Sequence, residues 1–121
     1  MKHFTQFINL EEDDKDLIVS FAVDDTEMGV KSLILHRTLL LEHIFDESER
    51  GVMVSLEGDY FDNENSNVLI NIKISDKEIH ITSSFREYDL DISHIEKSEI
   101  EEMQRLLNKQ NYDNSFTIQI A

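Results

Sequence analysis

Apolar and polar residues alternate with a period of two along most of the chain. In residues 17–24 one side of the alternation is wholly apolar: Leu17, Val19, Phe21 and Val23. Residues 4–10 place Phe7 on one parity and three apolar residues on the other: Phe4, Ile8 and Leu10. Alternation puts every second side chain on one face of a strand. The pattern therefore predicts two strands joined by a solvated turn through the letters "EEDDKD" (11–16).

A second hairpin is predicted in residues 68–85, "VLINIKISDKEIHITSSF". A turn at Asp76 and Lys77 places apolar residues opposite one another across the two strands. The predicted pairs are Ile74 with Ile79, Ile72 with Ile81, and Val68 with Phe85. Cross-strand pairs of this kind set the register. Both strands, with Ile70 and Phe85 included, are expected to offer their apolar side to the core.

The remaining segments complete an α+β pattern. Residues 31–37 and 52–58 favour strands, whereas 38–48 suit either a short helix or an extended run. Residues 99–110 predict one amphipathic helix, with Ser98 and Glu101 as a capping box. A last strand follows at 116–120. We expect a mainly antiparallel β-sheet with one C-terminal amphipathic helix packed on it, followed by a last strand.

Length and composition indicate one acidic α+β domain spanning residues 1–121. A chain of 121 residues that is 40% hydrophobic can bury a core. It contains no apolar run long enough for a membrane span and no signal-peptide pattern. It also contains no cysteine, which excludes disulfides and thiolate ligands. These features predict a cytoplasmic protein that does not interact with membranes.

The net charge of −15 changes the picture more than any motif does. The excess is spread out, with 14 acids against 5 bases in residues 1–60 and 12 against 6 in residues 61–121. Such a chain repels nucleic acid and anionic membranes and is steered toward basic partners. We therefore expect no direct binding of nucleic acid. Solubility alone is the competing interpretation of the charge.

No pattern indicates catalysis or a metal site. The five histidines lack the spacing of a zinc motif, and the glycines at 29, 51 and 58 form no phosphate-binding loop. The acidic segment 59–64 lacks the remaining ligands and the turn glycine of a calcium loop. We expect no enzyme, no metal and no cofactor.

Two acidic loops are the candidate partner-binding residues. The first is the hairpin turn, and its members are Glu11, Glu12, Asp13, Asp14 and Asp16. The second combines acids with aromatic residues, and its members are Asp59, Tyr60, Phe61, Asp62 and Glu64. An exposed aromatic flanked by carboxylates suits an anchor in a basic pocket, and Tyr88 in "FREYDLD" has the same setting. For Tyr60 and Phe61 a place in the core is the open alternative.

Three stretches resemble the immunity protein ten family of bacterial polymorphic toxin systems. They are "FINLEEDDKDLIVSFAVDD", "KSLILHR" and "VMVSLEGDYFDNENSNVLINIKISDKEIHIT". The family pattern has an acidic turn between two strands and then a hydrophobic-Gln-Arg step. The resemblance covers roughly residues 4–82. Two positions depart from it: His36 stands where the family has Gln, and "NENSNV" replaces a glycine-rich turn.

The resemblance implies a small, mainly β cytoplasmic protein that neutralises a cognate toxin by stoichiometric binding. A basic nuclease domain is one candidate for that toxin. The family carries no catalytic residues that could be transferred. The alternatives are a phage-type or other acidic inhibitor or decoy that binds a nuclease, and an acidic adaptor module without catalytic activity. Exposed sheet edges can also pair two copies into a homodimer.

Overall fold

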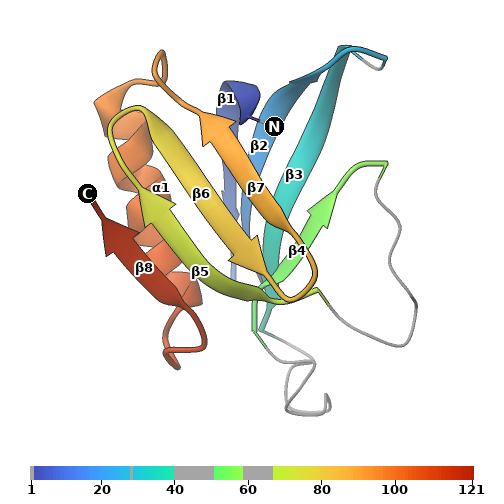
Figure 1. Ribbon diagram of the computed structural model, residues 1–121. Coiled ribbons are helices and arrows are strands. Elements are labelled where there is room, and N and C mark those ends of the chain that lie inside the picture. The colour runs from blue at the N-terminus through green and yellow to red at the C-terminus, as the bar shows by residue number, and fades with distance from the viewer. Residues whose placement is uncertain (1, 28, 40–50, 59–66) are drawn as a thin grey trace.

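The computed structural model describes residues 2–27, 29–39, 51–58 and 67–121. The expected α+β fold is confirmed, with one eight-stranded, mostly antiparallel sheet and one helix in this part of the chain (Figure 1). The elements in chain order are β1 (Lys2–Glu12), β2 (Asp16–Asp25), β3 (Gly29–Thr38), β4 (Met53–Leu56), β5 (Leu69–Ile74), β6 (Glu78–Ser83), β7 (Glu87–Asp91), α1 (Lys97–Gln110) and β8 (Thr117–Ile120). The helix of the described residues is too short and too polar to span a membrane.

The strands lie side by side in the order β4-β3-β2-β1-β7-β6-β5-β8. Two neighbouring pairs are parallel, β1 with β7 and β5 with β8. The sheet also curls, because Met53 of β4 forms a bridge with Val68 just before β5. Two backbone hydrogen bonds of 2.8 Å flank that bridge. The β1–β4 half and the β5–β8 half therefore meet twice, at β1–β7 and at this seam.

Both halves of the sheet contribute to one core, together with α1. The predicted inner residues of β2 are fully buried: Leu17, Val19, Phe21 and Val23. They belong to the same cluster as Ile72 and Ile81 of the other half. The apolar stripe of α1 completes it with Ile100, Met103, Leu106 and Leu107. In Figure 1 the helix lies behind β5 and β6, against the inner face of the sheet.

The helix begins differently from the prediction. It begins at Lys97, and its N-cap residue is Glu96, which makes no side-chain capping hydrogen bond. Ser98 is therefore already helical, and the proposed capping box is wrong. The position of the helix was predicted correctly from its apolar stripe. Burial of that stripe stabilises α1 regardless of which residue caps it.

Two register shifts overturn part of the predicted facing. A shift between Thr5 and Phe7 leaves Phe4 40% exposed, although it was expected on the same side as Ile8. A shift between Leu69 and Asn71 buries Leu69 and leaves Ile70 50% exposed. One extra residue in a strand reverses the facing of everything beyond it. Strict alternation could not reveal either shift.

The second shift also separates the predicted pair of Val68 and Phe85. Val68 bridges Met53 instead, and Phe85 lies 44% exposed in the connection between β6 and β7. The expectation of a buried Phe85 is wrong. The pairs nearer the turn, Ile74 with Ile79 and Ile72 with Ile81, are confirmed.

Strand β7 was missed, and Tyr88 was misassigned with it. Tyr88 is 4% exposed and Leu90 is fully buried, so the inner side of β7 is apolar. Three acids occupy its outer side: Glu87, Asp89 and Asp91. Asp is depleted in strands, and so many acids hid an otherwise regular alternation. Tyr88 is a core residue and cannot act as an exposed anchor.

Candidate functional site: the acidic hairpin and the adjoining sheet face

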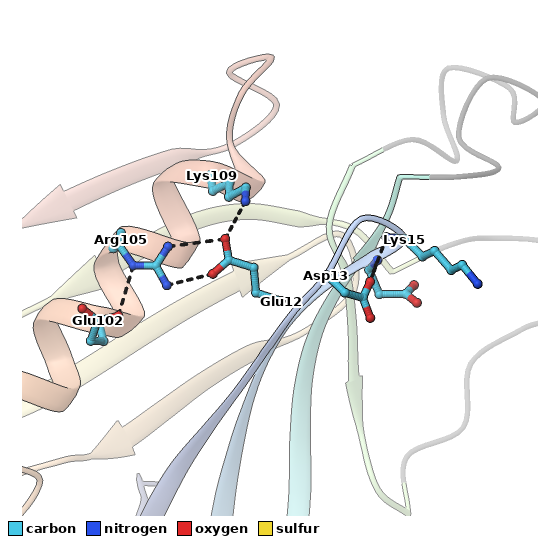
Figure 2. Close-up of polar contacts among 7 residues, drawn as sticks. Glu12, Asp13, Lys15, Glu102, Arg105 and Lys109 are labelled. Carbon is cyan, nitrogen blue, oxygen red and sulfur yellow. Dashed lines mark hydrogen bonds and ion pairs between the residues drawn. The ribbon is translucent and has the colours of Figure 1, made fainter.

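The predicted turn between residues 12 and 16 is built around Asp13. The Asp13 carboxylate accepts hydrogen bonds from the backbone N–H groups of Lys15 (2.8 Å) and Asp16 (2.7 Å). These donors, with that of Asp16 first, lower the pKa of Asp13. Figure 2 shows the Asp13 carboxylate turned back onto the chain. Asp13 therefore closes the turn and is not an open ligand.

Glu12 is on the inner side of β1, and it contacts the helix. Its carboxylate accepts hydrogen bonds from Arg105 (2.9 Å) and Lys109, while Arg105 also donates to Glu102 (3.1 Å; Figure 2). Arg105, followed by Lys109, lowers the pKa of Glu12 to about 2. A carboxylate held by two cations on the last turns of α1 docks the hairpin on the helix. It is not available to a partner.

The other three predicted acids of this loop face solvent. Asp16 is partly exposed, and its Oδ1 lies 2.8 Å from Nε2 of His36 on the neighbouring strand. Glu11 and Asp14 are exposed, and no side-chain partner is found for them in the described part of the chain. The five hairpin acids therefore divide into two internal contacts, one paired surface group and two open carboxylates.

The second predicted group lies outside the described residues. Its members are Asp59, Tyr60, Phe61, Asp62 and Glu64. Their assignment stays a prediction.

Glu11 and Asp16 belong to a larger outward surface of the sheet, which we call the β1–β4 face. It is formed by the outward positions of β1 from Phe7 onward and of β2, β3 and β4. Its apolar members are Phe7, Ile18, Ala22, Val30, Ile34 and Met53. Its carboxylates are Glu11, Asp16 and Asp24. Lys and Arg occupy none of these outward positions.

The outward surface of the other half, the β5–β8 face, is charged and internally paired. His80 of β6 contacts Asp89 and Glu87 of β7. These carboxylates, with Asp89 first, raise the pKa of His80. Lys2, at the start of β1, pairs with Glu78 at 2.5 Å. His80 and Lys2 therefore both have carboxylate partners on this face.

A groove of about 460 Å³ lies between the first half of α1 and the ends of β5 and β8. Its apolar wall comes from Ile74, Ile95, Ile100 and Ile120. The charged residues at it, Asp76, Lys97 and Glu101, are exposed. Ligand pockets are usually enclosed and hold a few converging polar groups. This groove is only partly enclosed, and its charged residues face solvent.

Sequence reasoning missed the most deeply buried charge of the described residues. Arg37 is fully buried on the inner side of β3. Its guanidinium donates to both oxygens of Asp113 at 2.8 Å and to the carbonyl of Gln110 at 2.8 Å, and lies 4.1 Å from the Tyr112 ring centroid. Arg37 lowers the pKa of Asp113 to about 2. The alternation of the strand could have revealed the burial of Arg37. Arg37 has the same parity as Leu33 and Leu35, which face the core.

Arg37 ties β3 to the segment between α1 and β8. Gln110 supports it, because its side-chain amide donates to the carbonyls of Leu17 (2.9 Å) and Leu35 (3.1 Å). Arg37, the last residue of the predicted Leu35-His36-Arg37 step, therefore has a structural role in this chain. The guanidinium itself is closed off from solvent.

No three His, Asp or Glu side chains come close enough to hold a metal ion within residues 2–27, 29–39, 51–58 and 67–121. The expectations of no metal, no cofactor and no enzymatic activity stay predictions. Comparisons with protein-family models, curated proteins and solved structures gave no match. The resemblance to the immunity protein ten family likewise stays a prediction.

Proposed function

We propose that this chain is an immunity-type protein that neutralises a basic toxin by binding it one to one. The observation that carries the proposal is the open carboxylates at the hairpin end, Glu11 and Asp14, in a chain of net charge −15. Fixed carboxylates of this kind speed the approach of a cationic surface and disfavour an anionic one.

The structure of the hairpin supports a role in binding. Asp13 fixes the turn and Glu12 fixes the hairpin against α1, so the neighbouring acids are held on a rigid element. A preorganised site loses less conformational entropy when a partner binds. An acidic nuclease decoy has the same chemistry, and its partner would be a host nuclease and not a toxin encoded beside it.

The experiment uses the product of the adjacent open reading frame. Both proteins are purified, mixed and separated by gel filtration, and the neighbour's toxicity is measured with and without this chain. We expect a 1:1 complex, loss of toxicity, and affinity that falls as salt rises from about 50 to 500 mM, because salt screens exposed charges. Absence of a complex with the products on both sides would overturn the immunity proposal.

A further inference from the structure

The central row of the β1–β4 face carries no Lys, Arg, Asp, Glu or His on any of its four strands. Cross-strand register places Ser20 beside Ile34 and Ile34 beside Ser55. The next row places Ile18 and Met53 on either side of His36. At the other end of the face Phe7 is 54% exposed and Val30 is 39% exposed. Exposed apolar surface rimmed by polar groups is typical of protein–protein interaction sites.

The rim of this surface is acidic at both ends. Glu11 pairs in register with Ile18 at the hairpin end, and Asp24 pairs with Val30 at the opposite end. Asp24 accepts a hydrogen bond from the exposed amide of Gln6 (2.6 Å), which leaves its charge unneutralised. Lys31 has the opposite parity on β3 and pairs with Asp25, away from this face. A partner that covers this surface must therefore place positively charged side chains near Glu11 and Asp24.

We propose that the β1–β4 face is the surface that the basic partner covers. Apolar side chains of the partner contact Phe7 and Ile34, and its Lys or Arg side chains lie over Glu11 and Asp24. This inference rests on the proposed function and names its surface. It places the contact on the side of the hairpin and not at its tip, because Glu12 and Asp13 at the tip already make contacts within the fold.

The acidic charge of the β1–β4 face determines which class of partner can cover it. A second copy would bring another net charge of −15 and the same acidic rim onto Glu11 and Asp24. Nucleic acid and anionic membranes are repelled for the same reason. A cationic protein surface with an apolar centre matches both properties of the face. Such interfaces usually depend on a few buried aromatic or aliphatic anchors inside a polar rim.

The test compares matched substitutions in the two halves of the sheet. The probe is the purified product of the adjacent open reading frame, and its affinity and association rate are measured by biolayer interferometry. Phe7→Ala is expected to weaken the affinity by about tenfold or more. Its control is Ile70→Ala, which truncates an equally exposed apolar residue of β5 and is expected to change affinity by less than about twofold.

A second pair of variants tests the rim. Glu11→Lys and Asp76→Lys make the same change in net charge, but Asp76 lies in the turn between β5 and β6. Glu11→Lys is expected to slow association about threefold or more relative to Asp76→Lys, because steering depends on where the charge lies. Thermal melts establish that each variant is folded.

The outcomes separate the two proposals. Binding by the wild-type chain that survives Phe7→Ala and Glu11→Lys unchanged would overturn the β1–β4 face and leave the immunity function standing. Equal losses for a substitution and its control would also overturn the face. If the wild-type chain binds neither adjacent product, the proposed function fails and the inference fails with it. Selective loss in the β1–β4 variants supports both.

Discussion

The two outward faces of the sheet differ in how many of their carboxylates contact a basic side chain. On the β5–β8 face, His80 lies between Asp89 and Glu87, and Lys2 pairs with Glu78. On the β1–β4 face, Glu11 and Asp24 have no cation beside them at any outward strand position. Net charge alone does not distinguish these arrangements. Glu11 and Asp24 are therefore open to a cationic partner, whereas Glu78, Glu87 and Asp89 already contact Lys2 or His80 within the fold.

The largest expected effect concerns Arg37, whose buried side chain joins the β1–β4 half of the sheet to the segment before β8. Arg37→Ala removes the buried guanidinium that links β3 to Asp113 before β8. It leaves the carbonyl of Gln110 without this donor and opens a cavity. Because the Asp113 side chain is 40% exposed, its freed carboxylate can be hydrated, and the expected cost of about 2–4 kcal/mol comes from the lost packing and the unsatisfied carbonyl. Urea unfolding followed by circular dichroism measures the loss.

The matched control for Arg37 is Arg105→Ala. Arg105 also binds a carboxylate, that of Glu12, but its side chain is 49% exposed. We expect a loss below about 1 kcal/mol, as for other exposed pairs. Similar losses for the two variants would show that the burial of Arg37 adds no stability beyond that of an exposed ion pair.

The next effect concerns the seam where β4 meets the start of β5. Gly51 has φ +117°, and a Cβ there would lie 3.1 Å from Cγ1 of Val68. Gly51→Ala is expected to cost about 2–3 kcal/mol, since it combines backbone strain with a close contact. Gly58→Ala is the control, because Gly58 has φ +93° but, apart from its chain neighbours, no atom of the described residues within 4 Å of the added Cβ. It should cost only the strain, about 1–2 kcal/mol.

A thermal melt of both glycine variants decides this prediction. If Gly51→Ala is as stable as Gly58→Ala or more stable, the seam is not closely packed. The two halves would then meet firmly only at β1–β7.

The sequence predicted the parts of this architecture that alternation controls. The buried side of β2 and the pairs of Ile72 and Ile74 follow from period two, because a core on one face demands it. The shifts in β1 and β5 were invisible, since any residue can form a bulge and the alternation on each side looks intact. The buried Arg37 was overlooked because charge suggests a surface position, although its parity was that of Leu35.

The candidate site was predictable only in part. The position of the acidic turn was predicted correctly. The contacts that Glu12 and Asp13 of this turn make within the fold were not predicted. Glu12 looks like its neighbours in sequence, and only the position of Arg105 and Lys109 on α1 distinguishes it. Contacts between residues so far apart in the chain depend on tertiary packing, which a local pattern does not contain.

A smaller effect should be visible as pH dependence of the β5–β8 face. Asp89, followed by Glu87, raises the pKa of His80 above its ordinary value of 6.5. A raised folded-state pKa contributes stability that is fully present below the unfolded-state value and is lost as pH rises through the folded-state value. The other charged side chains of this face include Lys2, Lys73, Glu78 and Asp91.

We therefore expect His80→Gln to lower stability at pH 5.5 and to matter less at pH 8.5. The difference should stay below about 1 kcal/mol, because the pairs are partly exposed. Thermal melts of both proteins at the two pH values measure it. A variant that loses as much stability at pH 8.5 as at pH 5.5 would show that protonated His80 does not hold β6 to β7.

The smallest effect compares like substitutions on the two faces directly. Asp89→Lys removes a carboxylate that contacts His80 and pairs in register with Lys2, so it should lower stability by about 0.5–1 kcal/mol. Glu11→Lys removes a carboxylate that contacts no cation of the described residues, so its effect should lie within about 0.5 kcal/mol of zero. It should even be slightly favourable at low salt, because reversing one acid relieves repulsion in a chain of net charge −15. A residue that can be reversed without loss of stability is not kept acidic by the fold. If Glu11→Lys instead destabilises the protein as much as Asp89→Lys does, the carboxylates of the β1–β4 face serve the fold after all, and the contrast between the two faces disappears.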